Sequence, residues 1–321
     1  MNLLTSLRYL AALDEHKHFG RAAAACHITQ PALSNALRAL EDEFGIAIVT
    51  RGRSFGGFTP EGARVLASAQ RMLRERELLQ QDLNSVAGSP QGTLSIGAVP
   101  TAVPIAARFA AMLQTRHPGI TPVVRSLSSS ELEAGLENFS LDMGLGYTER
   151  MADHGAKLRH VPQYTEHYFL VRKSGQTTQA QADRLQMGPK MTWLEASSLP
   201  LCLLTREMYN RTIIDAAFAL AGAVVKPVIE TNSILTLALT VAVGDVCSVL
   251  PGALISAVRG YRELEALPLI SPDVLTPIGF MLQGSNRTSR TLDAAMSMAQ
   301  DAAWLRHVAA HSGLLDVTEQ P

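Results

Sequence analysis

Apolar side chains in the first 45 residues recur at helical spacing. The leucines of residues 3–14 lie three and four positions apart, which predicts an amphipathic helix. The Ala-rich stretch 20–27 predicts a second, shorter helix. Pro31 then opens a third helix at the position where its missing N–H costs nothing, and Gly45 is placed to cap its end. We therefore expect three helices joined by tight turns.

The third predicted helix has two different faces. One face carries apolar side chains three and four positions apart and is expected to be buried: Leu33, Ala36, Leu37, Leu40 and Phe44. The other, with the residue just before the helix, carries small or polar groups suited to base edges and phosphates: Gln30, Ser34, Asn35 and Arg38. A polar face alone also fits any solvated helix. Its place after two short helices and before a hairpin favours a DNA-recognition helix.

Residues 46–59 predict a hairpin with a basic, Gly-rich tip. The apolar stretch 46–50 leads into the tip, and Phe58 and Thr59 form the start of the returning strand. We expect Arg51 and Arg53 in the tip to meet the phosphate backbone of DNA. Residues 1–59 are therefore expected to form a winged helix-turn-helix domain, rich in helix.

Residues 60–87 predict a long helix, opened by a Thr59 cap and by Pro60 at the first helical position. It would span roughly 42 Å at 1.5 Å per residue. Steps of four and three place one set of side chains on a coiled-coil seam: Val65, Ala69, Met72, Arg76, Leu79, Leu83 and Val86. A helix buried in its own domain would also show such a stripe, and Arg76 interrupts it. We interpret residues 60–90 as a linker helix that forms a homodimer.

Beyond residue 91, strands alternate with helices, a pattern typical of mostly parallel α/β sheets with helices on both faces. Strands are expected at 93–99, 122–127, 141–145, 168–172, 199–204 and 246–250, and helices at 104–116, 131–138, 211–221, 234–243 and 252–258. Residues 91–321 are thus expected to form two α/β subdomains with a ligand cleft between them. We place the first at about 91–161 and 268–321, and the second at about 162–267.

Four junctions between a predicted strand and a predicted helix carry a hydroxyl or amide. Ligands of open parallel sheets bind at the carboxyl ends of strands, where helix amino termini offer N–H groups. The candidate effector-binding residues are Pro100, Thr101, Ala102, Ser128, Ser129, Leu204, Thr205, Asn232 and Ser233. Each hydroxyl also suits an ordinary helix cap, and Ser130 with Glu133 has the spacing of a capping box. As a set they indicate a site for a small carboxylate, held by Thr101, Ser129 and Thr205.

Charge and composition narrow the function classes. The 321 residues carry a net charge of −1, and residues 1–90 hold 10 Lys and Arg against 9 Asp and Glu. DNA binding must therefore depend on where the charges lie. No apolar stretch approaches the roughly 20 residues of a membrane span, and the amino terminus lacks the pattern of a signal peptide. We expect a cytoplasmic protein with no membrane contact.

The sequence offers no support for an enzyme. It contains no HExxH, GxxxxGK or G-x-S-x-G motif and no His/Cys cluster, so we expect no catalysis, no metal and no cofactor. Cys26, Cys202 and Cys247 have no metal-ligand spacing. Cys202 and Cys247 both lie in apolar runs that predict strands. A redox-responsive regulator that uses this pair remains the alternative.

Several segments resemble, in order and spacing, the amino-terminal signature of LysR-type transcriptional regulators. They are 22–25, 28–34, Leu40-Glu41, Phe44-Gly45 and 59–62. The match runs without gaps through about residue 70, and 241–251 is similar to part of the family's regulatory domain. The resemblance implies a winged helix-turn-helix, a linker-helix dimer, often a homotetramer, and an effector domain like the periplasmic binding proteins.

The resemblance also implies which residues make contacts. It assigns DNA contacts to Gln30, Pro31, Ser34, Asn35, Arg38, Arg51 and Arg53, and effector contacts to the four junctions named above. Two departures bear on the operator sequence: Asn35 stands where many members have a cation, and Gly52, Gly56 and Gly57 make the wing unusually Gly-rich. Residues 199–205 and 210–215 resemble regulators associated with formate dehydrogenase operons, which makes formate one candidate effector.

Overall fold

The computed structural model describes residues 2–50, 52, 55–84, 89–150, 158–174, 185–258, 260–261, 263–284 and 288–312. These residues divide into two compact units. The first comprises residues up to 84 together with 138–140, and the second comprises 89–137 and 141–312. We describe each unit by itself.

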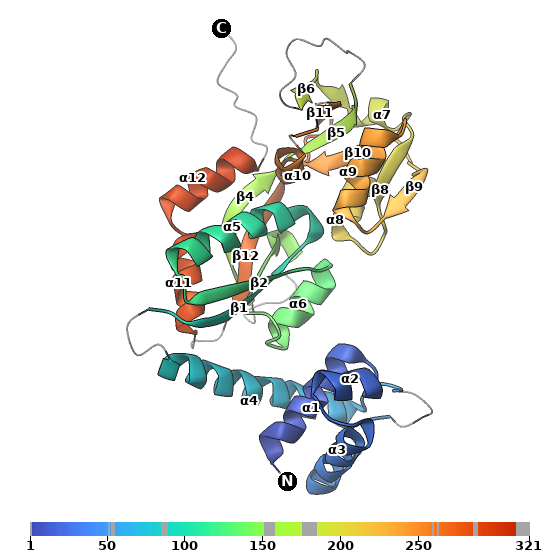
Figure 1. The fold of residues 1–321 in the computed structure, drawn as a ribbon. Coiled ribbons are helices and arrows are strands. Elements are labelled where there is room, and N and C mark those ends of the chain that lie inside the picture. The colour runs from blue at the N-terminus through green and yellow to red at the C-terminus, as the bar shows by residue number, and fades with distance from the viewer. Residues whose placement is uncertain are drawn as a thin grey trace. The chain divides into compact units, whose positions relative to one another are not determined.

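The first unit begins with three short helices, labelled in Figure 1: α1 (Leu3–His16), α2 (Phe19–Ala25) and α3 (Gln30–Phe44). Leucines from α1 and α3 pack with alanines of α2 in one core. Thr29 caps α3 by accepting a hydrogen bond from Ala32 N at 3.3 Å, and Gly45 ends it with a left-handed φ of 66°. The three predicted helices and the cap at Gly45 are confirmed.

Two details of this unit differ from the expectation. Phe44 was placed on the buried stripe, but it is 44% exposed, because it lies in the last turn of α3 beyond the reach of the core. The hairpin is also shorter than predicted. Among the described residues of the hairpin, the strands reduce to one bridge, between Val49 and Phe58.

The long helix α4 (Pro60–Asn84) follows the hairpin. Its first turns pack on the core of the first unit through Leu66 and Ala69. Farther along, Met72, Leu79 and Leu83 of the predicted seam are 49%, 53% and 59% exposed. Val86, the last seam position, lies outside the described residues.

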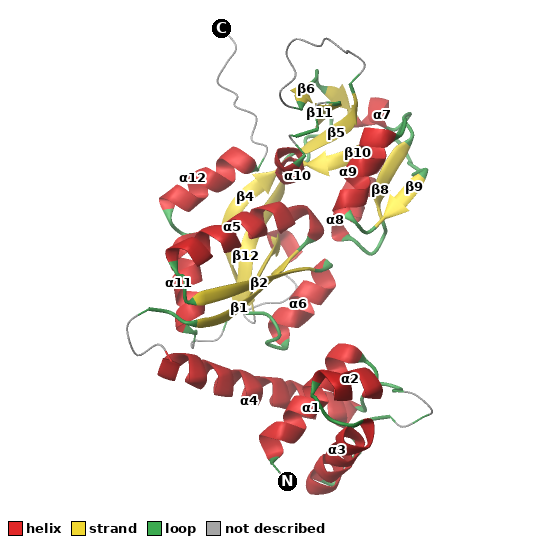
Figure 2. Cartoon of the chain, in the orientation of Figure 1, coloured by secondary structure: helices red, strands yellow, loops and turns green. Residues whose placement is uncertain are grey.

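The second unit contains two sheets with helices packed around them (Figure 2). The first sheet has the order β2-β1-β3-β12-β4. Its strands are β1 (Gly92–Ala98), β2 (Ile120–Ser126), β3 (Met143–Tyr147), β4 (Leu158–Glu166) and β12 (Thr276–Gln283). The helices associated with it are η1 (Pro100–Ala102), α5 (Val103–Arg116), α6 (Ser129–Glu137), α11 (Arg290–Ala299) and α12 (Ala302–His311).

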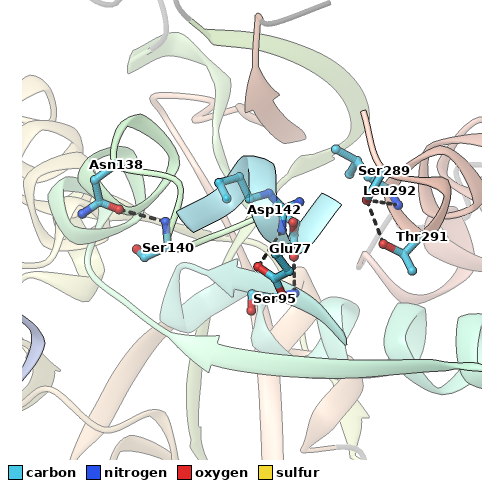
Figure 3. Close-up of polar contacts among 9 residues, drawn as sticks. Glu77, Ser95, Asn138, Ser140, Asp142, Ser289, Thr291 and Leu292 are labelled. Carbon is cyan, nitrogen blue, oxygen red and sulfur yellow. Dashed lines mark hydrogen bonds and ion pairs between the residues drawn. The ribbon is translucent and has the colours of Figure 1, made fainter. Parts of the chain in front are cut away.

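Short polar contacts fix the ends of these elements (Figure 3). The Asp142 carboxylate, just before β3, accepts a hydrogen bond from Ser95 N on β1 at 2.7 Å. Ser289 caps α11 by accepting from Leu292 N at 3.1 Å, and its hydroxyl lies 2.8 Å from that of Thr291. The first contact links two interior strands of the sheet, and the second fixes the start of a helix.

The second sheet has the order β6-β11-β5-β10-β8-β9, with β7 paired to β11. Its strands are β5 (Tyr168–Lys173), β6 (Gln186–Met187), β7 (Met191–Thr192), β8 (Leu201–Leu204), β9 (Ile229–Thr231), β10 (Cys247–Pro251) and β11 (Leu264–Ile270). Its helices are α7 (Trp193–Ala196), α8 (Tyr209–Leu220), α9 (Ile234–Val243) and α10 (Gly252–Ala257).

The two sheets are mixed rather than mostly parallel. β12 runs antiparallel to β3 and β4, and β5 runs antiparallel to β10 and β11. The expectation of mostly parallel sheets was wrong on this point: it omitted β4, β11 and β12, and it did not give the direction of β5, which runs antiparallel to the predicted strand at β10. Through these strands the chain passes from one sheet to the other, which reverses their direction.

The chain crosses between the sheets twice. The first crossing is at His167, between β4 and β5, and the second lies between Ile270 and Thr276. Both fall a few residues later than the expected subdomain limits at 162 and 268. The difference arises because β4 continues to Glu166 and β11 to Ile270. Among the helices described, none is long and apolar enough to cross a membrane.

Candidate DNA-binding surface and effector pocket

The polar face of α3 is accessible in the first unit. Gln30, Pro31, Asn35 and Arg38 are exposed, and Ser34 is half-buried. Positions 31, 34, 35 and 38 are three or four residues apart, so they share one face of the helix. Arg38 has no hydrogen-bond or ion-pair partner among the described residues, so its guanidinium is available to a phosphate or a base. Arg51 and Arg53 lie outside the described residues.

A buried carboxylate sets the angle between α3 and the hairpin. Glu41 is 8% exposed, and its Oε1 accepts hydrogen bonds from Ile48 N at 2.9 Å and Val49 N at 3.1 Å. Sequence reasoning did not assign this role. The signal was present, because Glu41 lies four residues after Leu37 and so falls on the apolar stripe. A charged residue on such a stripe is buried only when it is paired or hydrogen-bonded.

The wing is held from both ends. Thr50 N donates to Gly57 O at 2.9 Å, and Thr59 N donates to Ile48 O at 3.0 Å. The Phe55 ring packs edge-on against Phe58, with ring centroids 5.1 Å apart. Phe55 also contacts Phe19 of α2 at 6.0 Å. The aromatic contacts attach the base of the hairpin to the helix-turn-helix.

In the second unit, residues from both sheet layers line a pocket of about 490 Å³. Its lining consists of Pro100, Ser126, Leu127, Ser128, Ser130, Glu131, Glu207, Met208 and Asn232. Of the candidate effector residues, this lining includes Pro100, Ser128 and Asn232. Thr101, Ala102, Ser129 and Leu204 are buried, and Thr205 and Ser233 are half-buried. Three of the four predicted junctions therefore contribute at least one residue to the pocket lining, whereas the junction at Leu204 and Thr205 contributes none.

Several of the predicted hydroxyls already have local partners. Ser128 donates from N and from Oγ to Glu131 at 2.8 and 2.7 Å. Thr205 Oγ1 donates to Glu207 at 2.7 Å. Ser233 Oγ accepts from Thr236 N at 3.3 Å and so caps α9. These three residues therefore act as helix or turn caps. The carboxylates of Glu131 and Glu207 line the pocket beside them.

The predicted capping box needs correction. Ser130 and Glu133 were expected to form it, but Ser128 and Glu131 do. The Glu133 carboxylate instead receives Arg150 NH2 at 2.9 Å. The correction follows from α6 starting at Ser129, two residues earlier than expected, which moves the cap to Ser128.

Three buried polar groups lie near the pocket; Tyr147 and Asn210 were not predicted as site residues, whereas Ser129 was. The Tyr147 hydroxyl lies 2.9 Å from Thr101 Oγ1, and burial raises the pKa of Tyr147 far above its usual range. Asn210 on α8 is 4% exposed, and its Nδ2 makes no hydrogen bond of normal length and angle, only a weaker interaction with the hydroxyls of Tyr147 and Tyr168. Ser129 Oγ is also buried without a partner. Unpaired buried donors are uncommon in native proteins, so Asn210 and Ser129 mark where a polar ligand or water would be stabilised.

Cys202 and Cys247 lie on neighbouring parallel strands but on opposite faces of the sheet. Cys247 is level with Leu201, and Cys202 is level with Ser248. They accordingly belong to different apolar cores. Burial raises the pKa of both thiols. A disulfide between them would require the β8–β10 pairing to break, since successive side chains on a strand point to opposite faces.

No group of three or more His, Cys, Asp or Glu side chains within the described ranges could hold a metal ion. The side chains that line the pocket offer hydrogen bonding and charge. Hydroxyls, one amide and two carboxylates suit reversible binding of a small polar molecule.

Comparison with known proteins supplies two family matches. Residues 4–63 match the model described as "Bacterial regulatory helix-turn-helix protein, lysR family". Residues 87–304 match "LysR substrate binding domain". The second match alone covers more than half of the chain.

Individual relatives and structures agree. The chain is 29% identical over 297 residues to the "DNA-binding transcriptional dual regulator OxyR" of Escherichia coli K12, covering 89% of this chain and 92% of that one. It is 34% identical over 143 residues to a "Hydrogen peroxide-inducible genes activator" of Pectobacterium carotovorum, covering 44% of this chain and 47% of that protein. That second match spans about half the length of the relative.

Two solved structures share the fold. A full-length OxyR variant from Pseudomonas aeruginosa superposes with a TM-score of 0.66 at 23% identity, covering 99% of this chain and 100% of that one. Full-length CbnR in complex with its target DNA superposes with a TM-score of 0.63 at 18% identity, covering 95% and 99%. The helix-turn-helix, the two-sheet effector domain and both family matches agree: the chain belongs to the LysR family of transcriptional regulators, which are DNA-binding proteins with an effector-binding domain and not enzymes.

Proposed function

We propose that this regulator binds its operator with the exposed face of α3 and the wing, under the control of a small carboxylate bound near the pocket of the second unit. The observation that carries the proposal is the pocket itself, which residues from both sheet layers line beside the amino terminus of α6. A ligand there controls DNA binding only if it favours one arrangement of the domain over another.

The lining limits where an anionic effector would bind. Glu131 and Glu207 disfavour negative charge beside them. The buried, unpartnered Ser129 Oγ and the Thr101 hydroxyl offer the better place for a carboxylate, with backbone N–H groups of α6 nearby. This arrangement favours a small acid. Formate is one candidate.

We expect Thr101→Val to weaken binding of the effector roughly 10- to 100-fold, because a hydrogen bond to a charged group contributes about 1.5–3 kcal/mol. The measurement is calorimetric titration of the full-length protein with a panel of short carboxylates that includes formate. Thr115→Val is the matched control, since Thr115 lies exposed on α5 and bonds only its own helix at Ala111 O. Equal affinity of Thr101→Val and the parent for the acid that binds would reject this site.

The DNA surface has its own test. We expect Arg38→Ala to weaken operator binding and to reduce the slope of log K against log salt by about one unit if Arg38 meets a phosphate. Binding to the upstream region of the regulator's own gene, measured by gel retardation at several salt concentrations, gives both numbers. Arg306→Ala on α12 is the control, because Arg306 is exposed in the other unit. An unchanged affinity and slope for Arg38→Ala would contradict the assignment.

We further propose that the protein is a homodimer through α4 and assembles into a tetramer. The support is exposed apolar surface. Met72, Leu79 and Leu83 follow the predicted seam of α4. In the second unit Leu235, Leu239 and Val243 lie four residues apart on α9, and they are 63%, 44% and 80% exposed. Two separate apolar faces on one chain suit two kinds of subunit contact.

A response to peroxide is the second candidate function, favoured by the relative named as a hydrogen peroxide-inducible genes activator. The Cys202–Cys247 pair could serve it only after local unfolding of β8 and β10, given the opposite faces on which the two thiols lie. Operator binding with and without peroxide, in the parent and in Cys202→Ser and Cys247→Ser, tests it. A peroxide effect that survives both substitutions would leave these thiols without a role.

A further inference from the structure

A buried polar cluster lies where the chain crosses between the two sheets of the second unit. Glu166 ends β4 and is 0% exposed, and Tyr168 begins β5 just beyond the crossing. On the return crossing, Thr276 begins β12 and is level with Glu166 in the strand register. The Tyr168 hydroxyl lies 3.2 Å from Thr276 Oγ1. One hydrogen bond therefore joins both crossings.

The Glu166 carboxyl has little to stabilise a negative charge. Tyr164 OH donates to its Oε1 at 3.3 Å, and its Oε2 has no partner. No cation of the described chain pairs with it. Burial raises the pKa of Glu166 from 4.5 to about 8, so the carboxyl is mostly protonated at neutral pH.

The groups around Glu166 are phenols and uncharged side chains. Tyr164 on β4, Tyr147 on β3 and Tyr168 on β5 are the titratable groups that interact with it. β12 contributes Thr276, and α8 contributes Asn210 and Tyr209 next to Tyr147. α10 has no titratable side chain and contacts the crossing through Gly252 N, which donates to His167 O at 2.9 Å. His167 itself is half-buried beside Glu166.

Asn210 supplies the complementary unpaired group. Its Nδ2 is a buried donor that makes no hydrogen bond of normal length and angle, and its weaker interaction with the hydroxyls of Tyr147 and Tyr168 offsets part of the rise that burial causes in the pKa of each. Glu166 interacts with the same two phenols. An unpaired acceptor from the first sheet and an unpaired donor from the second sheet layer thus flank one pair of tyrosines. Leaving both without a good partner is unfavourable, and a shift at the crossing that brought the two side chains together would let each satisfy the other.

We propose that Glu166 and Asn210 form a proton-controlled latch at the hinge between the two sheets. With Glu166 protonated, the hinge keeps the arrangement described here. With Glu166 ionised, the two sheet layers shift until Asn210 Nδ2 donates to the carboxylate. Because Tyr147 also bonds Thr101, the shift reaches the wall of the effector region. The latch goes beyond the proposed function and needs no effector to operate.

The sign of the pH dependence follows from the two arrangements. Hydrogen bonding to the ionised carboxylate lowers its pKa in the shifted arrangement, whereas burial raises it in the arrangement described here. A rise in pH toward and through 8 therefore favours the shifted arrangement. Conversely, the stability that the protonated Glu166 gives to the described arrangement is fully present below pH 4.5 and is lost as the pH rises through about 8.

Tryptophan fluorescence of the full-length, effector-free protein tests the latch. Trp193 is a built-in reporter, because its Nε1 donates to Pro272 O on the return crossing at 3.0 Å and its ring centroid lies 6.1 Å from that of Tyr168. We expect the parent's emission to change between pH 6 and 9 with a midpoint near 8. Glu166→Gln should abolish this step. Glu133→Gln, which alters a carboxyl paired with Arg150, should retain it.

Two further variants keep the proposal falsifiable if Glu166→Gln does not fold. Tyr164→Phe removes the one hydrogen bond to the carboxyl and should raise the midpoint by about one pH unit. Asn210→Leu removes the donor and should raise the midpoint and reduce the emission change. The latch is overturned if Glu166→Gln keeps the step of the parent. It is also overturned if Tyr164→Phe or Asn210→Leu leaves both the midpoint and the amplitude unchanged.

Discussion

Replacing Leu79 and Leu83 together by glutamate is expected to separate the subunits, so that a protein that sediments as a dimer or larger assembly becomes monomeric at micromolar concentration. Both leucines are more than half exposed in the single chain and lie on the predicted seam of α4. Fully burying a leucine stabilises by about 1.5–3 kcal/mol. Only a little over half of each side chain is still exposed, so the four leucines of a dimer account for about 3–6 kcal/mol. Losing even the smaller figure raises the dissociation constant more than about 10²-fold.

Because both side chains are exposed, the double substitution should leave the fold of each unit intact. Circular dichroism should therefore match that of the parent while sedimentation velocity reports the change in mass. Gln80→Glu is the control, since Gln80 is exposed on the same turns of α4 but off the seam. It adds a charge without removing apolar surface and should leave the assembly unchanged. A double variant that stays dimeric would place the subunit contact elsewhere, for example on the exposed face of α9.

The helix-turn-helix could be predicted from sequence because its signals are local. Helical spacing of leucines, Pro31 at a helix start and Gly45 at a helix end each act within a few residues, and all three helices are confirmed. Glu41 was missed because its partners, Ile48 and Val49, depend on how the chain turns after α3. The seam of α4 was predicted from its period, but period alone does not say whether a stripe faces the same chain or another.

The second unit was predicted less completely, because its order depends on distant contacts. β12 pairs with β4 across more than 100 residues, and nothing in the local pattern of either strand indicates its partner. The antiparallel strands β4, β11 and β12 were missed for this reason. The opposite faces of Cys202 and Cys247 follow from the register of β8 and β10, which sequence spacing does not give.

The effector region shows a third limit on what can be predicted from the sequence. Serine and threonine at strand-to-helix junctions were singled out as effector contacts, but their spacing could not separate helix caps from free ligand contacts. Ser128 and Thr205 turned out to bond carboxylates of their own loops. The groups left without partners, on Ser129, Asn210 and Glu166, are recognisable only once the tertiary packing has buried them.

Gly62→Ala is expected to destabilise the first unit by about 3 kcal/mol or more and to abolish operator binding. A Cβ on Gly62 would lie 2.0 Å from Ile48 O and 2.8 Å from Ile48 C, so backbone rather than a flexible side chain has to move. Ile48 is fully buried, its O accepts from Thr59 N and its N donates to Glu41. Displacing it therefore disturbs both the start of α4 and the attachment of the wing to α3. Overpacking in a well-packed core costs about 1–3 kcal/mol, occasionally more, and rigid backbone contacts favour the upper end.

Calorimetry of the full-length protein measures the effect as a fall in the unfolding temperature of the first unit. In the parent, that unit's transition is identified as the one whose temperature rises when operator DNA is added. Gly45→Ala is the matched control in the same unit. Gly45 has a left-handed φ of +66° and nothing within 4 Å of an added Cβ, so its substitution introduces backbone strain alone, about 1–2 kcal/mol. Gly62→Ala should lower the transition further than Gly45→Ala and should lose DNA binding while Gly45→Ala retains it. If the two variants prove equally stable, the close approach of α4 to the backbone of Ile48 is not what fixes the wing.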